Sequence, residues 1–328
     1  MQDSSAESVL LVQVRELLGL PSDIAADQLP EPGRTYLNYA LSTVTRGELV
    51  LDRIRKYRSV KGLRFLDVGC AYGGFLVAAA RAGASEVAGF DTDPRLIRIA
   101  RSYTEAHEIA AVIENGDVTN EGFVRQLGTF DVISCNDVIE HVDDVPQCIA
   151  NLAGLLGEGG VIHMAIPNRR SPGLIRSDPH FKVFGIVLLE RPEAIRYHTI
   201  LTGIDHYDVG DFFQLDHYLR LFREHGLSVT ITNAPVKSAH WVVKELEPDF
   251  AALRQENEVF DDERLPEELK AKTRVAVLGI VHLFEKKLAD YKSLLASKQS
   301  EKATAMSLEI AREFYLETWY AIVERPSQ

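Results

Sequence analysis

The sequence predicts an α/β fold: a seven-stranded, mostly parallel sheet with helices on both faces, a lid insertion and a helical C-terminal extension. Short apolar segments at 65–68, 86–90, 111–114, 130–135 and 161–166 alternate with stretches of helical periodicity, which is typical of parallel βαβ units. A glycine-rich turn at 69–74 follows the first of these segments. Such a turn is expected where a strand leads into a helix beside a bound ligand.

The composition is that of an ordinary globular protein with about two domains, or one domain with large additions. The chain has 328 residues, a net charge of −12 and a pI near 5.4, which argue against a nucleic-acid partner. No apolar run approaches the ~20 residues of a transmembrane segment, and the first residues lack a signal-peptide pattern. Cys70, Cys135 and Cys148 lack metal-ligand spacing. We therefore expect a cytoplasmic protein with reduced thiols.

The first βαβ unit, residues 64–93, indicates the kind of ligand. Its strand runs into the turn DVGCAYG, residues 67–73, and the next strand ends on Asp91. Glycine there lets backbone N–H groups approach a ligand. Asp67 would repel a pyrophosphate and attract an ammonium group, while Asp91 can accept hydrogen bonds from ribose hydroxyls. The unit therefore favours a nucleoside with a cationic amino-acid tail over a dinucleotide, which would also need a third glycine.

The remaining segments complete the sheet and surround it. Helices are predicted at 8–18, 36–57, 96–107, 148–156 and 211–225, the third with Asp93 as its N-cap and Pro94 in its first turn. Strands at 227–232 and 240–244 are predicted to finish the sheet as a hairpin pair. Residues 246–324 are predicted to be helical around an acidic link at 245–268, with helices at 267–297 and 301–324. Their apolar faces need a partner, either the sheet domain or a second copy of the chain as a homo-oligomer.

The segment 167–210 breaks the alternation of strands and helices. It carries four prolines, and from 169 to 198 it has six Lys or Arg against three acids. An excursion of this length is usually a binding loop or lid. Its basic residues could face an anionic group of a bound small molecule, the head groups of anionic lipids, or solvent. We divide the chain into N-terminal helices over the cofactor site (1–60), a cofactor-binding domain with the lid insertion (61–245) and a helical extension (246–328).

These segments resemble the motifs of class I (Rossmann-like) S-adenosylmethionine (SAM) dependent methyltransferases of the small-molecule or sugar O-methyltransferase type. The family's first motif is D-x-G-x-G-x-G with a ribose-binding acid about 20 residues on. Ala71 replaces the middle glycine, a mild change if its φ is negative. NGDV at 115–118 matches the adenine motif, although alone it is an ordinary turn. FDVISCNDVIEHVDD, residues 130–144, is similar to the subset that includes ubiquinone-biosynthesis O-methyltransferases.

The resemblance implies SAM as cofactor, with S-adenosylhomocysteine (SAH) as product. It also implies which residues contact the cofactor: Asp67, Gly69, Cys70, Ala71, Gly73, Asp91, Thr92, Asp117, Val118 and Asn136. In this family a helix before the first strand usually packs over the cofactor, so Tyr36 or Tyr39 could touch it. Packing in the core is the other interpretation of these two tyrosines.

The chemistry requires little of the protein. A sulfonium methyl is already electrophilic, so the main task is to align an acceptor with it. A hydroxyl acceptor benefits from a general base, for which histidine is suited. We predict His141, after the fourth strand, and His180, in the lid, as catalytic residues, although either could only pack or lie at the surface. No metal is predicted, although Asp137, Asn168 and Asp205 could converge as oxygen ligands.

These features predict an enzyme that moves a methyl group from SAM to a hydroxyl oxygen of a small-molecule or glycan-type acceptor in a biosynthetic pathway. A quinone or phenol O-methyltransferase at the membrane surface, with residues 181–189 touching the bilayer, is the alternative within the enzyme class. A SAM-binding scaffold protein without turnover is the alternative outside it. An NAD-dependent oxidoreductase is disfavoured by Asp67 and by the missing glycine.

Overall fold

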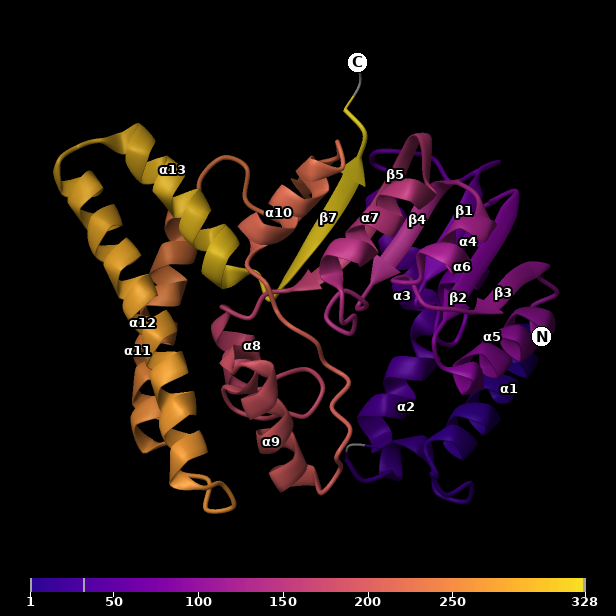
Figure 1. Ribbon diagram of the computed structural model, residues 1–328, viewed down its shortest axis with the longest axis horizontal. Coiled ribbons are helices and arrows are strands. Elements are labelled where there is room, and N and C mark those ends of the chain that lie inside the picture. Colours follow the sequence, from indigo (N-terminus) through magenta and orange to yellow (C-terminus); the bar gives the residue numbers. More distant parts are fainter. Residues whose placement is uncertain (1, 32, 327–328) are drawn as a thin grey trace.

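The computed structural model describes residues 2–31 and 33–326 and contains a seven-stranded sheet in the order β3-β2-β1-β4-β5-β7-β6 (Figure 1). The strands are β1 (Arg64–Val68), β2 (Glu86–Asp91), β3 (Ala111–Asn115), β4 (Phe130–Asn136), β5 (Leu156–Pro167), β6 (Ser228–Ile231) and β7 (Thr318–Glu324). β1 to β5 pair in parallel, whereas β7 runs antiparallel to both β5 and β6. The predicted fold class is confirmed.

Helices cover both faces of the sheet. They are α1 (Gln2–Leu17), α2 (Gly33–Leu41), α3 (Thr43–Ile54), α4 (Gly74–Arg81), α5 (Pro94–Ala106), α6 (Glu121–Leu127), α7 (Val145–Leu155), α8 (Pro172–Arg176), α9 (Arg191–Thr202), α10 (Leu215–Glu224), α11 (His240–Val259), α12 (Glu267–Ala296) and α13 (Ser300–Ile310). Short helical turns lie at Ala26–Gln28 (η1), Ile186–Leu188 (η2) and Ala311–Tyr315 (η3), the last being π-helical. None of the described helices is long and apolar enough to cross a bilayer.

The two faces have separate apolar cores. On one face α3 and α4 pack on the sheet, with Leu51 of α3 against Phe65 of β1 among the fully buried side chains. On the other face α7 and α10 pack on it, with Leu152 and Phe222 buried beside Ile162 of β5. The sheet is therefore buried on both sides, as its continuous apolar strands predict.

The last strand of the sheet corrects two predictions. The strand predicted at 240–244 is wrong, because His240 begins helix α11, and the end of the helix predicted at 301–324 is wrong, because Thr318–Glu324 forms β7. Trp319 lies opposite Ile166 of β5, and Glu324 lies opposite Val161. A central strand is apolar on both faces, so its sequence lacks the alternation that separates a strand from a buried helix.

Smaller differences concern helix boundaries. The helix predicted at 36–57 is two helices, α2 and α3, that meet at Ser42. Most of the predicted link at 245–268 belongs to α11, which contains Pro248 in its interior. Helix α6 was not predicted at all; Asn120 caps it by accepting from the N–H of Phe123 at 3.1 Å. The N-cap of α5, Asp93 followed by Pro94, lies where it was predicted.

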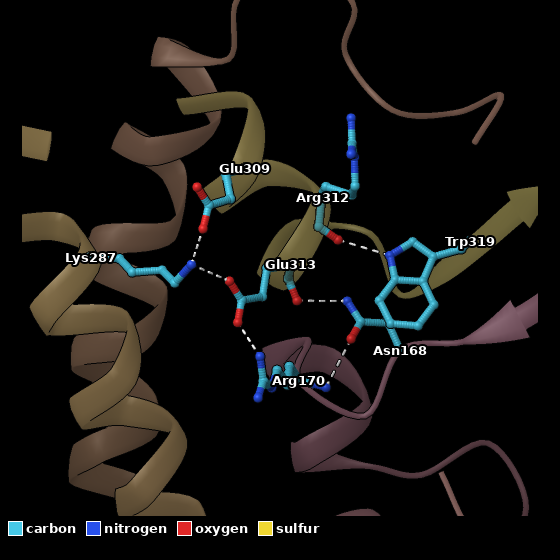
Figure 2. A network of polar contacts seen from close by, with 7 residues as sticks. All are labelled: Asn168, Arg170, Lys287, Glu309, Arg312, Glu313 and Trp319. Carbon is cyan, nitrogen blue, oxygen red and sulfur yellow. Dashed lines mark hydrogen bonds and ion pairs between the residues drawn. The ribbon is translucent and has the colours of Figure 1, made fainter. Parts of the chain in front are cut away.

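Helices α11 to α13 form an arm, residues 240–310, which stands to one side of the sheet in Figure 1. Asn168, directly after β5, is buried and donates to the carbonyls of Glu313 at 2.9 Å and Leu316 at 2.8 Å. Arg170 pairs with the carboxylate of Glu313, which also pairs with Lys287 of α12 at 2.7 Å (Figure 2). These contacts fix the base of the arm to the carboxyl end of β5.

The lid, residues 167–210, also packs against the arm. Its arginines pair with acids or backbone carbonyls: Arg176 with Asp249 and Glu256, Arg196 with Glu268, Arg191 with Asp143, and Arg169 with the carbonyls of Leu188 and Phe212. The side chains of Val183 and Ile186 to Leu188 are buried in the core that the lid shares with α11 and α12. The basic cluster therefore holds the lid to the protein. In the segment 181–189, suggested as a membrane contact, Phe181, Phe184 and Leu189 are partly exposed and the other apolar side chains are buried.

Candidate active site

The glycine-rich turn after β1 has unusual backbone geometry. Gly69, Ala71 and Gly73 have φ values of 71°, 43° and 78°. The condition under which Ala71 would be a mild change, a negative φ, is therefore not met, and a non-glycine residue in this region carries backbone strain of order 1–3 kcal/mol. Asp91 offsets the strain, because its Oδ2 accepts from the N–H of Ala71 at 3.0 Å. A Cβ at Gly69 would lie 2.5 Å from Val138 in the loop after β4, so glycine is required there.

The N–H groups of this turn are directed into the protein. Those of Gly69 and Cys70 both donate to the carbonyl of Phe90, at 2.9 and 3.0 Å, and that of Gly73 donates to the carbonyl of Cys70 at 2.8 Å. Together with the bond from Ala71 to Asp91, these bonds use the donors that a pyrophosphate would need. The side chain of Cys70 is buried in the core, so only its backbone borders the site. The turn suits a ligand with a cationic end.

The carboxylates of Asp67 in β1 and Asp91 at the end of β2 lie next to the glycine-rich turn. Asp67 is 4% exposed, and burial raises the pKa of its carboxyl well above the usual value. Burial also raises the pKa of Asp91, whose Oδ1 accepts from the N–H of Asp93 at 2.9 Å. A buried carboxylate is stabilised by a cationic ligand. The residues therefore fit SAM, whose ammonium would face Asp67 and whose ribose would face Asp91.

Arg46 of α3 is a site residue that the sequence analysis missed. Its guanidinium lies 3.6 Å from the centroid of the Tyr39 ring, and its charge lowers the pKa of Asp67 and Asp137 against the larger effect of burial, which raises both. Its Nε is buried without a hydrogen-bond partner. No local motif marks Arg46. Only its position on the helix that leads into β1 could have indicated it.

The adenine motif lies at the end of β3. Asp117 Oδ1 accepts from the N–H and the hydroxyl of Thr119, both at 2.8 Å, which is the ordinary turn that its sequence also suggested. Val118 is buried. The side-chain amide of Asn115 donates to the carbonyls of Asp91 and Thr92, at 2.8 and 2.9 Å, and so joins the ends of β2 and β3. The predicted ribose and adenine residues thus lie at one edge of the sheet.

The two predicted catalytic histidines, His141 in the loop after β4 and His180 in the lid, lie side by side. The ring centroids of His141 and His180 are 5.0 Å apart. His141 Nδ1 lies 2.8 Å from the carbonyl oxygen of Asp208. Burial lowers the pKa of His180 to about 4, and the backbone N–H groups of His180 and Phe181 donate to the buried carboxylate of Asp178. His180 is therefore neutral at pH 7 and held on a rigid turn.

Buried Glu140 joins this histidine pair. Burial raises the pKa of Glu140 to about 8, and its Oε2 has no hydrogen-bond partner. One ligand atom from each of Glu140, His141 and His180 lies within 4.8 Å of the others, so these three residues could hold a divalent cation. In the oxygen set suggested from the sequence, the side-chain oxygen of Asn168 accepts from the N–H of Arg170 at 3.1 Å, and its N–H groups donate to the carbonyls of Glu313 and Leu316.

The N-terminal helices cover the rim of the site. The hydroxyl of Tyr36 donates to the carbonyl of His180 at 2.9 Å, and that of Tyr39 lies 3.4 Å from Asp137 Oδ2. These tyrosines are 40% and 44% exposed, so the interpretation that they pack in the core is wrong. Burial of its hydroxyl and the nearby Asp137 raise the pKa of Tyr39 to about 12. Helix α2 thus links the end of β4 to the lid.

This arrangement, a parallel sheet with a glycine-rich turn after β1 and acids at the ends of β1, β2 and β3, is that of a class I methyltransferase. Comparison with known proteins agrees. A family model described as a methyltransferase domain matches residues 42–231, which is more than half of the chain. The chain therefore belongs to this methyltransferase family.

Its relatives include O-methyltransferases. It is 30% identical over 155 residues to a ubiquinone biosynthesis O-methyltransferase of Coxiella burnetii, covering 47% of this chain and 63% of the relative. It is 37% identical over 112 residues to a protein of the same name from Rhizobium johnstonii, covering 34% of this chain and 44% of the relative. The chain thus spans less than two thirds of the length of these relatives.

A solved structure shows a distant likeness. Magnesium protoporphyrin IX methyltransferase from Synechocystis, crystallised with SAH, matches with 16% identity and a TM-score of 0.44 over 69% of this chain and 88% of that chain. This likeness is too weak to support any argument about the site or the acceptor.

Proposed function

We propose that this methyltransferase moves the methyl group of SAM to a hydroxyl oxygen of a small-molecule acceptor, either sugar-containing or phenolic. The observation that carries the proposal is the pair His141 and His180 beside the carboxyl end of β4. SAM supplies an electrophilic methyl group, and the protein's part is to orient the acceptor and remove its proton.

The hydrogen bond of His141 defines which nitrogen can act as base. A backbone carbonyl only accepts, so His141 Nδ1 carries a proton and donates to Asp208. In the neutral ring Nε2 then has the free lone pair, which can take the proton of an acceptor hydroxyl. The neutral ring of His180 beside it lines the same space, and Tyr36 fixes the backbone of that residue.

The cofactor roles proposed for the remaining residues follow their placement. Asp67 binds the ammonium group, Asp91 the ribose hydroxyls and Asp117 the adenine amino group. Gly69, Cys70, Ala71 and Gly73 border the amino-acid tail, while Thr92, Val118 and Asn136 border the ribose, the adenine ring and the reactive methyl. The positive φ of three turn residues and the shared edge of β1 to β4 support this assignment.

The proposed base is tested by His141→Gln. We expect kcat to fall by about 10²- to 10⁴-fold, with the affinity for SAM unchanged. Before the acceptor is known, activity can be assayed as transfer of a tritiated methyl group from SAM to pooled cellular metabolites. His206→Gln, at an exposed position in the lid, is the matched control. An unchanged kcat in His141→Gln would remove His141 from the chemistry.

Our proposal includes no metal, although Glu140, His141 and His180 could hold one. Dialysis of the protein against EDTA should therefore leave methyl transfer unchanged. A loss of turnover that added Mg²⁺ or Mn²⁺ restores would replace the base mechanism with alignment of the acceptor on a cation.

A quinone-type phenol is the second candidate acceptor. It is favoured by the names of the curated relatives, which are ubiquinone biosynthesis O-methyltransferases. The burial of residues 183 and 186–188 disfavours the lid as its membrane contact. Sedimentation with anionic liposomes separates the candidates, because a lipid-soluble quinone predicts recruitment to the vesicles and a soluble acceptor predicts protein in the supernatant. A protein that binds SAM tightly but transfers no methyl group to any pool would instead be a scaffold.

A further inference from the structure

Four polar side chains, of which Asn136 is half-buried and the other three are buried, cross the middle of the sheet. They are Asp67 on β1, Ser134 and Asn136 on β4, and His163 on β5. The register places Asp67 opposite Ser134, and Ser134 opposite His163, so these side chains share one face of the sheet. Ser134 and His163 are completely buried, although most of their neighbours on this face are apolar. Polar side chains buried in such an apolar core need hydrogen-bond partners.

The hydrogen bonds join all four side chains in one thread. His163 Nδ1 lies 2.7 Å from Asn136 Oδ1, and Asn136 Nδ2 lies 2.7 Å from Ser134 Oγ. Ser134 lies opposite Asp67 in the register of the sheet, and a hydrogen bond from its hydroxyl lowers the pKa of the Asp67 carboxyl against the larger effect of burial. The thread therefore starts at a histidine deep under the sheet and ends on the carboxylate beside the glycine-rich turn.

The chemistry of each group fixes the direction of the thread. An amide oxygen only accepts, so His163 donates from Nδ1 to Asn136; an amide nitrogen only donates, so Asn136 donates to Ser134. The hydroxyl of Ser134 then gives its own proton to Asp67. All three N–H or O–H donors point towards the carboxylate. Hydrogen bonds that run in one direction polarise one another, and here they favour a negative charge at Asp67.

We infer that His163 is a positioning residue for the cofactor: through Asn136 and Ser134 it keeps Asp67 ionised and oriented for the ammonium group of SAM. This inference rests on the proposed role of Asp67. Asn136 has a second role in this inference, because both the oxygen and the nitrogen of its side-chain amide are hydrogen-bonded within the thread. Asn136 can then present only one orientation beside the reacting methyl group.

The surroundings of the thread agree with this role. Asp67 faces the carboxylate of Asp91, which opposes its charge, and Arg46, which favours it. At the other end the ring of His163 stacks on Tyr320 of β7, with centroids 6.1 Å apart. Buried His163 Nε2 has no hydrogen-bond partner, as expected for a neutral ring whose proton is on Nδ1.

Arg53 of α3 lies on the far side of the Tyr320 ring, with its guanidinium carbon 3.7 Å from the ring centroid. Burial and the positive charge of Arg53 both oppose protonation of His163. The ring is therefore held neutral and in a single tautomer, so the donor end of the thread stays constant around neutral pH.

Two variants at one position test the inference. His163→Asn can place an amide N–H where Nδ1 lies, whereas His163→Leu has a similar size and no donor. The dissociation constants of SAM and SAH are measured by calorimetry from pH 6 to pH 8. We expect the Leu variant to bind SAM about tenfold more weakly at pH 6, with the loss shrinking towards pH 8 as Asp67 ionises, and the Asn variant to stay within about threefold of wild type.

Methylthioadenosine, which lacks the amino-acid tail, separates positioning from general damage to the site. Its affinity should be the same in wild type and in both variants. The inference would be overturned if His163→Leu bound SAM with the same pH dependence as wild type. It would also be overturned if His163→Asn and His163→Leu weakened SAM binding equally. If the Leu variant does not fold, Ser134→Ala breaks the thread at another link and predicts the same shift. A wild-type protein that binds neither SAM nor SAH would instead refute the proposed function.

Discussion

Asp91 has two tasks at the residue scale. Each of its carboxylate oxygens accepts one backbone N–H, from Ala71 and from Asp93, and so supports the strained turn. Each oxygen keeps a further lone pair, which in our proposal accepts a ribose hydroxyl. In this proposal the same side chain both shapes the turn and binds the ribose, so its removal should affect both.

Asp91→Ala should weaken SAM binding ten- to a hundredfold, because charge-assisted hydrogen bonds contribute about 1.5–3 kcal/mol. Isothermal titration with SAM measures the effect. Asp93→Ala, two residues away at the N-cap of α5, is the control and should stay within about threefold of wild type. An unchanged dissociation constant in Asp91→Ala would mean that the ribose lies elsewhere.

His163 should make the protein sensitive to acid. Burial, with the nearby charge of Arg53, lowers its pKa from 6.5 to about 3. Between these pH values the unfolded state binds a proton that the folded state excludes, so the free energy of unfolding falls as the pH falls. His163→Asn cannot titrate, so its stability should decline less between pH 7 and pH 4 in urea denaturation. The exposed His225→Asn should follow wild type, and equal slopes for wild type and His163→Asn would contradict the assignment.

Residues within contiguous motifs could be predicted from the sequence, while those brought in by packing could not. Asp67, Gly69 and Asp91 lie in one βαβ unit whose spacing fixes their place at the sheet edge. Arg46 reaches the same edge from a separate helix, and no spacing relates it to the turn. Asp178 accepts from three backbone N–H groups of the lid, and the Asp-Pro pair before His180 was the signal that could have indicated such a turn.

At the scale of elements, β7 shows where prediction failed. Five parallel strands were found because each is a short apolar segment that ends at a break in the apolar pattern. Residues 318–324 follow a long helical region, and all but their two ends and Tyr320 are buried. The π-helical turn at Ala311–Tyr315 ends that region, and the indole N–H of Trp319 donates back to the carbonyl of Arg312 at 2.8 Å (Figure 2). Nothing in local propensity marks this change from helix to strand.

Removing β7 should unfold the sheet domain. A chain truncated after Glu317 loses the strand that pairs with both β5 and β6, and it exposes their edges. We expect no cooperative thermal transition by circular dichroism and no SAM binding. A chain truncated after Arg325 is the control and should behave as wild type. A folded, SAM-binding protein without residues 318–328 would show that β7 is dispensable.

Asn168 should be the most sensitive position in the junction of arm and sheet. Asn168→Ala leaves the buried carbonyls of Glu313 and Leu316 without their donor. Each unsatisfied group costs about 1–3 kcal/mol, so we expect a clear fall in the denaturation midpoint. Asn38→Ala, at an exposed position in α2, should change it little. Equal midpoints for the two variants would mean that the arm is held by other contacts.

On the scale of the whole molecule, the sheet is assembled from distant parts of the chain. Its first five strands come from residues 64–167, and β7 comes from residues 318–324, after the arm. The helical extension is present, yet its last segment belongs to the sheet. The division of the chain into domains at 1–60, 61–245 and 246–328 stays a prediction. The cytoplasmic location and the homo-oligomer through the C-terminal helices also stay predictions.

The arm and the lid pack against each other. Ion pairs and buried apolar contacts join the lid to α11 and α12, whereas the N-terminal helices meet it through Tyr36 at the rim. The lid is thus held by the arm on one side and meets α2 on another. This division could not be predicted from the sequence, because every contact in it joins segments far apart in the chain.

The central claim is that SAM lies along the carboxyl edge of the sheet, with its ammonium group at Asp67 and its ribose at Asp91. A crystal structure of the protein grown with SAH tests this most directly. We predict density for SAH over the turn 69–73, with the ribose hydroxyls within hydrogen-bond distance of Asp91 and the adenine beside Asp117 and Val118. Density for SAH at any other place, with this edge empty, would contradict the account.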